Sequence, residues 1–216
     1  SSIPFFSKDF DINIPKHSVQ MSSRKLRYEW FYQLLEIHKY DYILTAHHLN
    51  DSIETFLINL IRSTGIDGLT GIKSINNKVI RPLLYFNKSQ IMNYAFENKI
   101  QWREDSSNKK NDYLRNKIRN KLLPVLKDID SDFINNFSNT IDRLKDSSLI
   151  LKQYTESFKS LHFIENNDQI LILKSTLINL SETMIFNLFN DYGFKNPEQI
   201  LNLCSSKSGK IITSKL

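Results

Sequence analysis

Few glycines, a single cysteine and the lack of any long apolar run are the first features of this sequence. Cys204 has no second cysteine to pair with, so a disulfide framework and a cysteine-rich metal site are excluded. No apolar run approaches the roughly 20 residues that a membrane-spanning helix needs. We therefore expect a cytoplasmic protein that does not engage a membrane.

The five glycines are unevenly placed along the chain. Gly65, Gly68 and Gly71 fall within seven residues, directly after an apolar helical pattern that carries two acidic residues. Glycine permits tight turns and close approach of the backbone to a ligand. This segment is therefore a candidate for a turn beside a binding site.

Charge and aromatic content indicate a folded, basic protein of one or two domains. Lysine and arginine total 29 against 23 acidic residues, which gives a net charge of +6 and an isoelectric point near 9.2. The 14 Phe and 9 Tyr residues favour a packed core over disorder. The basic surface suits a polyanionic partner such as RNA, although many basic proteins bind none.

In the first half of the chain, apolar patterns alternate between the period of strands and the period of helices. Strands are predicted over residues 5–14, 42–46 and 78–81. Helices are predicted over residues 19–39, 51–63 and 89–99. This alternation predicts an α/β fold with a parallel sheet and crossover helices.

In the second half the pattern becomes mainly helical. A hairpin is predicted over 161–173, and helices over 114–125, 133–158, 176–191 and 197–204. We place the domain boundary at 127–132, with a single domain and a helical tail as the alternative. The predicted segments are then 1–128, 129–206 and 207–216.

Four polar side chains follow the predicted strand at 42–46, namely His47, His48, Asp51 and Glu54. In an open α/β sheet, ligands bind where a strand ends beside the next helix. Asp51 and Glu54 are three apart and share one face of the first helical turn, where they could hold a cation that bridges phosphates. The same pair also fits a capping box that only starts the helix. The histidines could contact a ligand, but no third metal ligand follows at a recognisable spacing.

Arginines form a second group of candidates. Arg115 and Arg119 are four apart and share a helix face. Guanidinium groups suit phosphate oxygens, but a basic helix face is often only solvated. Arg24 and Arg27 lie on the first predicted helix, and Arg81 stands at a strand end. Arg24 and Arg27 could contact a ligand or only lie on the surface. Arg81 could contact a ligand or form a structural salt bridge.

Three polar residues and both tryptophans complete the set. Asn116 lies beside the paired arginines, and Glu104 and Asp105 precede the same helix in a loop. These acids could orient the arginines or reach a substrate amine. Trp30 and Trp102 are predicted to be core residues rather than stacking platforms for bases.

In chain order these residues form a set of spaced motifs. They are Arg24-x-x-Arg27-Tyr28, His47-His48-x-x-Asp51-x-x-Glu54-Thr55, Arg62-Ser63-x-Gly65-x-x-Gly68-Leu69-x-Gly71, Arg81-Pro82-Leu83-Leu84, Trp102-x-Glu104-Asp105-x-Ser107-Asn108, Tyr113-x-Arg115-Asn116-x-Ile118-Arg119 and Leu122-Leu123-Pro124. Each motif alone would be weak evidence. The set, in register over residues 20–126, resembles the tRNA(Ile)-lysidine synthetase family of PP-loop ATPases, of the N-type ATP pyrophosphatase class.

The resemblance implies an adenine nucleotide alpha hydrolase-like, Rossmann-like fold and a ligase reaction that uses ATP and Mg²⁺. The family adenylates the wobble cytidine of a tRNA(Ile) with a CAU anticodon, and the ε-amine of L-lysine then displaces AMP to give lysidine. It implies a nucleotide-binding catalytic domain over 1–128, a helical domain that binds tRNA or connects domains over 129–206, and the start of a C-terminal domain at 207–216. A homodimer is compatible with the resemblance.

The resemblance also assigns roles to residues of this sequence. The implied catalytic residues are Asp51, Glu54 and Arg115. The residues implied to bind ATP and Mg²⁺ are His47, Asp51, Glu54 and Arg27, with Asp51 as the metal ligand. The residues implied to contact lysine or tRNA are Arg81, Glu104, Asp105, Asn116 and Arg119.

One departure from the family pattern concerns the phosphate-binding loop. The family carries Ser-Gly-Gly-x-Asp-Ser after its first strand, and this sequence has no such run. We expect a piece of a longer enzyme that by itself binds ATP very weakly, makes no lysidine and associates through exposed sheet surface. Another PP-loop ATP-dependent ligase and a non-catalytic basic RNA-binding module remain as alternatives.

Overall fold

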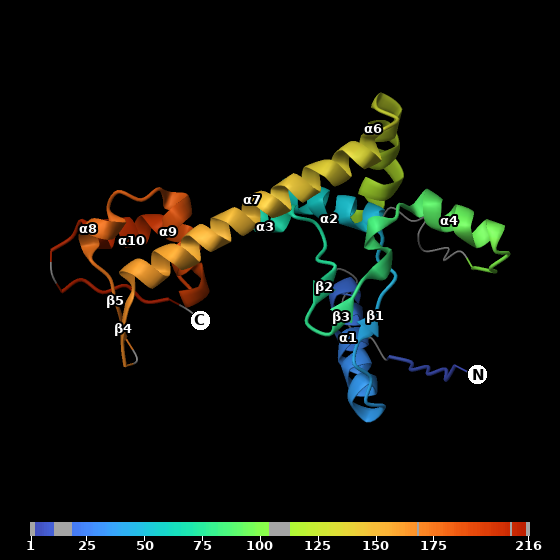
Figure 1. Ribbon diagram of the computed structural model, residues 1–216, viewed down its shortest axis with the longest axis horizontal. Coiled ribbons are helices and arrows are strands. Elements are labelled where there is room, and N and C mark those ends of the chain that lie inside the picture. The colour runs from blue at the N-terminus through green and yellow to red at the C-terminus, as the bar shows by residue number, and fades with distance from the viewer. Residues whose placement is uncertain (1–2, 11–18, 104–112, 168, 208, 215–216) are drawn as a thin grey trace. The chain divides into compact units, whose positions relative to one another are not determined.

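The computed structural model describes residues 3–10, 19–103, 113–167, 169–207 and 209–214 (Figure 1). The chain forms two compact units, Ser1–Ile141 and Asp142–Leu216. The long helix α7 (Phe133–His162) runs through the division. The division therefore falls inside a helix, a little after the boundary predicted at 127–132.

Unit 1 contains one small sheet and most of the helices. In chain order its elements are α1 (Val19–Ile37), β1 (Ile43–Leu44), α2 (Leu49–Ile61), α3 (Ile66–Leu69), β2 (Ile75–Asn76), β3 (Val79–Ile80), the 3₁₀ helix η1 (Pro82–Tyr85), α4 (Lys88–Glu97), α5 (Leu114–Lys117), the π-helical turn η3 (Ile118–Leu122), α6 (Leu123–Ile129) and the start of α7. The helices predicted at 19–39, 51–63 and 89–99 are confirmed as α1, α2 and α4.

The sheet of unit 1 has the strand order β1-β3-β2. β1 and β3 are parallel, with Ile43 opposite Val79, and β2 is antiparallel to β3. The chain passes from β1 to β3 through α2, as expected for a crossover connection. β2 was not predicted, because two residues are too few to show a period.

The strand predicted at 5–14 is wrong over the part that the structure describes. Residues 3–10 have no regular structure, and Phe5 is 89% exposed. Residues 11–14 lie outside the described chain. Alternation of apolar and polar residues predicts a strand only where a neighbouring strand can satisfy its backbone groups.

Two apolar clusters hold unit 1 together. The sheet packs on α1 through Leu35, Ile43 and Val79. The N-terminal half of α2 packs elsewhere, with fully buried Ile53 in contact with residues of η3, α6 and α7. The members of this second cluster are Ile53, Ile118, Leu123, Ile134, Phe137 and Ile141. As a result, α2 links the sheet to the later helices of the unit.

The helix predicted at 114–125 is interrupted by a widened turn. α5 passes into the π-helical turn η3 directly before α6, which carries Pro124 in its first turn. Pro124 has no N–H to bond to the carbonyl of Asn120, and its ring would clash with that carbonyl in a regular helix. The widened turn accommodates the proline, and such turns are frequent at functional sites.

Two of the three clustered glycines lie in close packing after α2, Gly68 against Thr64 of the same loop and Gly71 against Ser52 of the helix. A Cβ on Gly68 would lie 2.4 Å from Thr64 Oγ1, and one on Gly71 would lie 3.1 Å from Ser52 Oγ. Ser52 Oγ also accepts a hydrogen bond from the Ile72 N–H at 3.1 Å. Close backbone approach, predicted from sequence for a ligand, is therefore observed here between a loop and its neighbouring helix.

Gly71→Ala is expected to lower the free energy of unfolding by about 1–2 kcal/mol, because Gly71 has φ +74° and an L-residue is strained there. The added Cβ would also crowd Ile141 Cδ1, at 3.2 Å. Gly65→Ala is the matched control, since no atom lies within 4 Å of its Cβ position, and it should change stability by less than about 0.5 kcal/mol. Urea unfolding curves of the two variants check this, and equal midpoints would contradict it.

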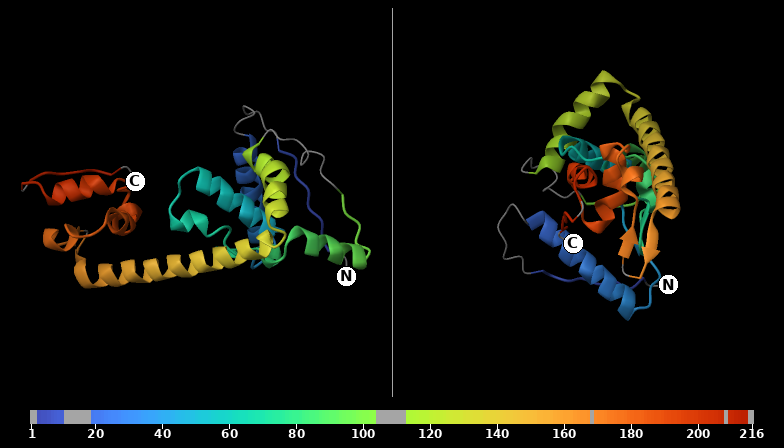
Figure 2. Two further views of the ribbon diagram at one scale, coloured as in Figure 1. Left: turned by 90° about the horizontal axis from the view of Figure 1, so that it is seen from above. Right: turned by 90° about the vertical axis from the view of Figure 1, so that its left-hand side faces the viewer.

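In unit 2, short helices pack against the C-terminal part of α7, and the strands of the hairpin that follows α7 are exposed (Figure 2). Its elements after α7 are β4 (Ile164–Asn166), β5 (Gln169–Leu171), α8 (Lys174–Leu177), α9 (Glu182–Phe189), the 3₁₀ helix η4 (Asn190–Tyr192) and α10 (Pro197–Cys204). The core of the unit is formed by Phe158, Leu177, Met184, Ile185, Leu188 and Ile200. The predicted hairpin is confirmed as an antiparallel pair, and the helix predicted at 197–204 is confirmed as α10.

The single helix predicted at 176–191 is wrong. The structure has two helices, α8 and α9, separated by residues 178–181. Ser181 caps α9, because its hydroxyl accepts a hydrogen bond from the Met184 N–H at 3.3 Å. Over the parts of the chain that the structure covers, no helix has both the length and the apolar character to cross a bilayer.

Candidate functional site

The site begins where β1 passes into α2. The N-cap of α2 is His48, so Asp51 is the third residue of the helix, and its Oδ2 accepts a hydrogen bond from the His48 N–H at 3.0 Å. A capping role for Asp51 is therefore confirmed. The predicted capping box, with Asp51 as N-cap and Glu54 as its partner, is wrong, because the helix begins three residues earlier, with His48 as N-cap and Asp51 as the partner. Glu54 instead lies one turn further into the helix.

Glu54 is fully buried and is held by two arginines from a distant segment. Arg119 donates from Nε to Oε1 at 2.6 Å and from Nη2 to Oε2 at 3.0 Å. Arg115 places its Nε 3.4 Å from Glu54 Oε2. A bidentate arginine contact of this kind fixes both groups in orientation. The prediction that Arg115 and Arg119 share one helix face is confirmed, because both reach the same carboxylate.

Arg119 also joins the two acidic residues to each other. Its Nη2 donates to Asp51 Oδ1 at 3.2 Å. Arg115 Nη2 donates to Thr55 Oγ1 at 2.9 Å, and that hydroxyl donates to the Asp51 carbonyl at 2.8 Å. The arginine side chains are 37% and 29% exposed, so the alternative of a freely solvated basic face is wrong for these two residues.

Burial and pairing act in opposite directions on the Glu54 carboxyl. Burial raises its pKa above the ordinary value, and the hydrogen bond and charge of Arg119 lower it in part. The same hydrogen bond raises the pKa of Arg119, which therefore stays cationic. The cluster thus holds fixed positive charge beside a carboxylate from which water is excluded.

His47 lies at the edge of this cluster in a positive field. Burial lowers the pKa of its imidazole, Asp51 opposes that shift, and Arg81, Arg24 and Arg115 add to it. Its Nδ1 lies 2.9 Å from Thr45 Oγ1. The imidazole is therefore neutral at neutral pH and can exchange a hydrogen bond with a ligand.

His47 gives stability a pH dependence of definite sign. Its folded-state pKa lies below the ordinary 6.5, so the unfolded chain binds more protons between the two pKa values. The free energy of unfolding therefore rises as pH rises through that window toward 6.5. We expect His47→Gln to flatten this rise relative to the parent chain. Urea unfolding between about pH 5 and 8 measures it, and parallel profiles for the variant and the parent chain would refute it.

Arg81 and Tyr28 line a basic hollow of about 430 Å³ together with Arg24 and Lys25. Arg81 is only 5% exposed, and its Nη1 donates to the Lys73 carbonyl at 2.7 Å. Arg81 Nε and Tyr28 Oη are buried and lack a hydrogen-bond partner among the residues that the structure describes. Buried polar atoms are normally paired, so these two indicate a polar or anionic ligand.

A second cleft, of about 300 Å³, opens beside the paired carboxylates. Its lining comes from α2, α4, η3 and α6, and consists of His48, Asn50, Glu54, Lys88, Arg119, Leu123, Pro124 and Lys127. Asn50 Oδ1 accepts a hydrogen bond from the Lys88 N–H at 2.9 Å and ties α4 to α2. Sequence analysis missed Lys88 and Lys127, because no local pattern places distant lysines in one cleft.

The remaining predicted residues are Arg27, Asn116, Glu104 and Asp105. Arg27 is exposed on α1, whereas its neighbour Arg24 contributes to the field at His47. Asn116 is half-buried in α5. Glu104 and Asp105 lie outside the described residues.

Comparison with known families decides the classification. The model of the family described as "PP-loop domain" matches residues 1–126, more than half of the chain. The chain belongs to the PP-loop family. The match covers the sheet of unit 1, the cluster around Glu54 and both clefts up to the start of α6.

Other similarities are more specific than the PP-loop match. Residues 165–216 match a model described as "TilS substrate binding domain". The chain is 34% identical over 190 residues to the tRNA(Ile)-lysidine synthase of Porphyromonas gingivalis strain W83, covering 88% of this chain and 41% of that protein. It is 35% identical to the synthase of Bacteroides thetaiotaomicron and 30% identical to that of Parabacteroides distasonis, covering 45% and 50% of those proteins. The chain spans about half the length of the curated relatives it matches.

The carboxylates of this PP-loop chain differ in their fitness for a metal ion. Both Glu54 oxygens contact arginines, which leaves the side chain no free ligand edge. Each Asp51 oxygen also accepts a hydrogen bond, Oδ1 from Arg119 and Oδ2 from the His48 N–H, but this side chain is 14% exposed and can still reach a ligand. Mg²⁺ is commonly held by one or two carboxylates together with substrate phosphates, so Asp51 is the better placed of the two carboxylates to hold it. Within the described ranges no group of three or more His, Cys, Asp and Glu side chains forms a complete metal site.

Proposed function

We propose that the chain is part of an ATP-dependent ligase that joins L-lysine to the wobble cytidine of tRNA(Ile) with a CAU anticodon. The reaction runs through an adenylated cytidine, and lysine displaces AMP to form lysidine. The observation that carries this proposal is the bridging of Asp51 and Glu54 by Arg119 at the start of α2. It occurs in a chain whose relatives bear the name tRNA(Ile)-lysidine synthase.

The proposal extends to the fold and the domains. Residues 1–128 form the nucleotide-binding catalytic domain, with a Rossmann-like parallel sheet and crossover helices. The parallel pair β1 and β3, connected through α2, supports this assignment. Residues 129–206 form a helical domain that binds tRNA or connects domains, and residues 207–216 begin a C-terminal domain. The substrate-binding match over residues 165–216 supports a substrate-binding role for the later part of the chain, and it runs across the boundary between these two segments.

In the adenylation step, the arginines meet the nucleotide. Arg115 contacts phosphate oxygens, and neutral His47 contacts the nucleotide beside it. Glu54 acts as a positioning residue that holds both arginines of the later helices in orientation. Asp51 holds Mg²⁺, which when bound neutralises charge on the departing pyrophosphate. Arg27 is the remaining nucleotide contact of the proposal.

In the second step, the lysine amine must lose a proton before it attacks. The partly exposed carboxylate of Asp51 is the nearest acceptor that the cluster offers. The cleft beside it carries Lys88, Arg119 and Lys127, which suit the α-carboxylate of lysine. The other proposed contacts with lysine or tRNA are Arg81, Glu104, Asp105 and Asn116.

The test uses the protein at its full length. Labelled lysine is incubated with ATP, Mg²⁺ and a tRNA(Ile) transcript with a CAU anticodon, and label in the tRNA is counted. The control transcript differs only in its wobble base and should stay unlabelled. A different PP-loop ligase would form AMP without labelling the tRNA with lysine. A non-catalytic RNA-binding module would bind the transcript and leave ATP intact.

The proposed substrate also bears on location and assembly. We propose that the protein acts in the cytoplasm, where tRNA is used for translation. A homodimer stays a prediction, and sedimentation of the full-length protein at several concentrations would test it.

A further inference from the structure

A further candidate binding surface lies at the C-terminal end of α4, outside the cluster around Glu54. The helix ends in a left-handed turn at Lys99, with φ of 53°. The Ile100 N–H donates to the Ala95 carbonyl at 2.8 Å, and the Lys99 N–H donates to the Phe96 carbonyl at 3.1 Å. This pattern is a Schellman motif, which reverses the chain. The reversal brings residues 100–103 back beside the last turn of the helix.

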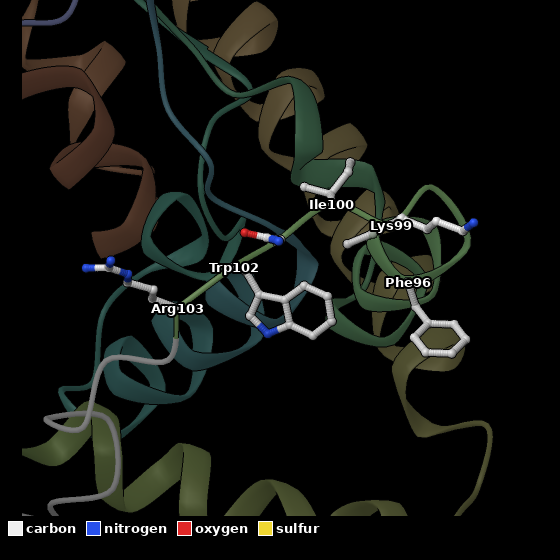
Figure 3. A pocket seen from close by; sticks show the side chains of 7 residues that line it. Phe96, Lys99, Ile100, Trp102 and Arg103 are labelled. Carbon is white, nitrogen blue, oxygen red and sulfur yellow. The ribbon is translucent and has the colours of Figure 1, made fainter.

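The turn encloses an open hollow of about 730 Å³ (Figure 3). Its lining consists of Ala95, Phe96, Lys99, Ile100, Gln101, Trp102 and Arg103. Figure 3 shows the Trp102 indole extending toward the side on which Phe96 lies, while Arg103 extends the other way. The hollow is therefore bounded by aromatic faces and flanked by cations.

Both aromatic side chains are unusually accessible. Phe96 is 77% exposed and Trp102 is 49% exposed. The prediction that Trp102 is a core residue is therefore wrong. Large apolar side chains that gather on a surface mark a binding site more often than a chance arrangement.

Charge indicates what kind of molecule would bind there. Among the described residues that line the hollow, two are cations, Lys99 and Arg103, and none is acidic. An exposed indole beside two cations offers a flat face for stacking and partners for phosphate. Unpaired nucleotides present both features at once, because their bases are free to stack and their backbone is anionic.

We propose that this hollow, bounded by Phe96 and Trp102, binds an unpaired nucleotide of single-stranded RNA, with the base stacked on the Trp102 indole. Arg103 and Lys99 contact the neighbouring phosphates. The inference rests on the proposed function in that it takes RNA as the partner. It adds a surface that contacts RNA and lies outside the cluster at α2, where the proposed reaction takes place.

The experiment follows the fluorescence of Trp102 in the full 216-residue chain. The chain has two tryptophans, so Trp30→Phe leaves Trp102 as the sole emitter. The probes are an RNA hairpin with a seven-nucleotide loop containing CAU, at about the size of an anticodon arm, and a blunt RNA duplex of the same stem. Stacking is expected to quench the emission with the hairpin and to leave it nearly unchanged with the duplex.

Substitutions then separate stacking from charge. Trp102→Ala is expected to weaken hairpin binding by about 5- to 150-fold, the range for losing one base-stacking aromatic side chain. Trp102→Phe retains a ring and should recover most of the affinity, which guards against a loss due to misfolding. Arg103→Gln should reduce the slope of log affinity against log salt by about one unit or slightly less. Tyr94→Ala is the matched control, since Tyr94 is an exposed aromatic residue of α4 that does not line the hollow.

The outcomes distinguish this inference from the proposed function, because binding is measured without ATP or lysine. Equal hairpin affinity in Trp102→Ala and Tyr94→Ala, or equal quenching by hairpin and duplex, would overturn the inference and leave lysidine formation untouched. Loss of affinity confined to the Trp102→Ala variant would support it even if no lysine were incorporated into tRNA.

Discussion

Glu54→Ala is expected to lower the free energy of unfolding of the chain by about 3 kcal/mol. Glu54 is 0% exposed and satisfies Arg119 through two hydrogen bonds, so its removal leaves a guanidinium without its partner. Breaking a buried pair costs about 3–5 kcal/mol. The lower end applies because the Arg115 and Arg119 side chains are 37% and 29% exposed and can turn toward water. Urea unfolding followed by circular dichroism measures the loss.

Two further variants show whether the loss of stability depends on the hydrogen bonds of Glu54 or follows from removing any acid. Glu54→Gln keeps the shape and one acceptor for Arg119, and it should lose less stability than Glu54→Ala because burial already raises the pKa of this carboxyl. Glu97→Ala removes an exposed acid from α4 and should change stability by less than about 0.5 kcal/mol. If Glu54→Ala unfolded at the same urea concentration as Glu97→Ala, the positioning role of Glu54 would be refuted.

Asp51→Ala is expected to reduce adenylation of tRNA by the full-length protein by a factor on the order of 10² to 10³. This is the usual loss when one group that stabilises developing charge is removed, and Asp51 is proposed to hold the Mg²⁺ that has this role. Asp51 is suited to this role because it is the partly exposed carboxylate of the cluster, in contact with Arg119. The rate of pyrophosphate release in the presence of tRNA measures the effect.

Asp51 also caps α2, so its structural role must be measured separately. Loss of the hydrogen bond to the His48 N–H should lower stability by about 0.5–2 kcal/mol. Asp41→Ala, at an exposed position before β1, is the matched control for removing an acid. A stability loss of that size with pyrophosphate release retained would make Asp51 a capping residue only.

The sequence alone predicted the parts of the site that depend on local spacing. The three-residue spacing of Asp51 and Glu54 and the four-residue spacing of Arg115 and Arg119 each placed two side chains on one helix face. Spacing within one helix does not show which other helix that face will pack against. The contact between Arg119 and Glu54 joins residues 65 positions apart and depends on how α2 packs against η3 and α6.

Burial was the property that the sequence predicted least well. Trp102 was predicted to lie in the core and is half exposed, whereas Glu54 was predicted to reach a ligand and is fully buried. An acid is buried at low cost only where a cation pairs with it, and here that cation comes from a distant segment. Similarly, Gly71 packs closely against Ser52 of α2. Each outcome is decided by tertiary neighbours that no local pattern contains.

The most direct test of the central claim is transfer of AMP to tRNA when lysine is withheld. The full-length protein is incubated with the tRNA(Ile) transcript and ATP labelled at the α-phosphate, and labelled tRNA is separated on a gel. We expect label to accumulate in the tRNA and to be released as AMP when lysine is added. Asp51→Ala should label the tRNA far more slowly than the parent protein. Two results would contradict the account. One is tRNA that stays unlabelled without lysine although the same protein incorporates lysine when it is supplied, and the other is equal labelling by Asp51→Ala and the parent protein.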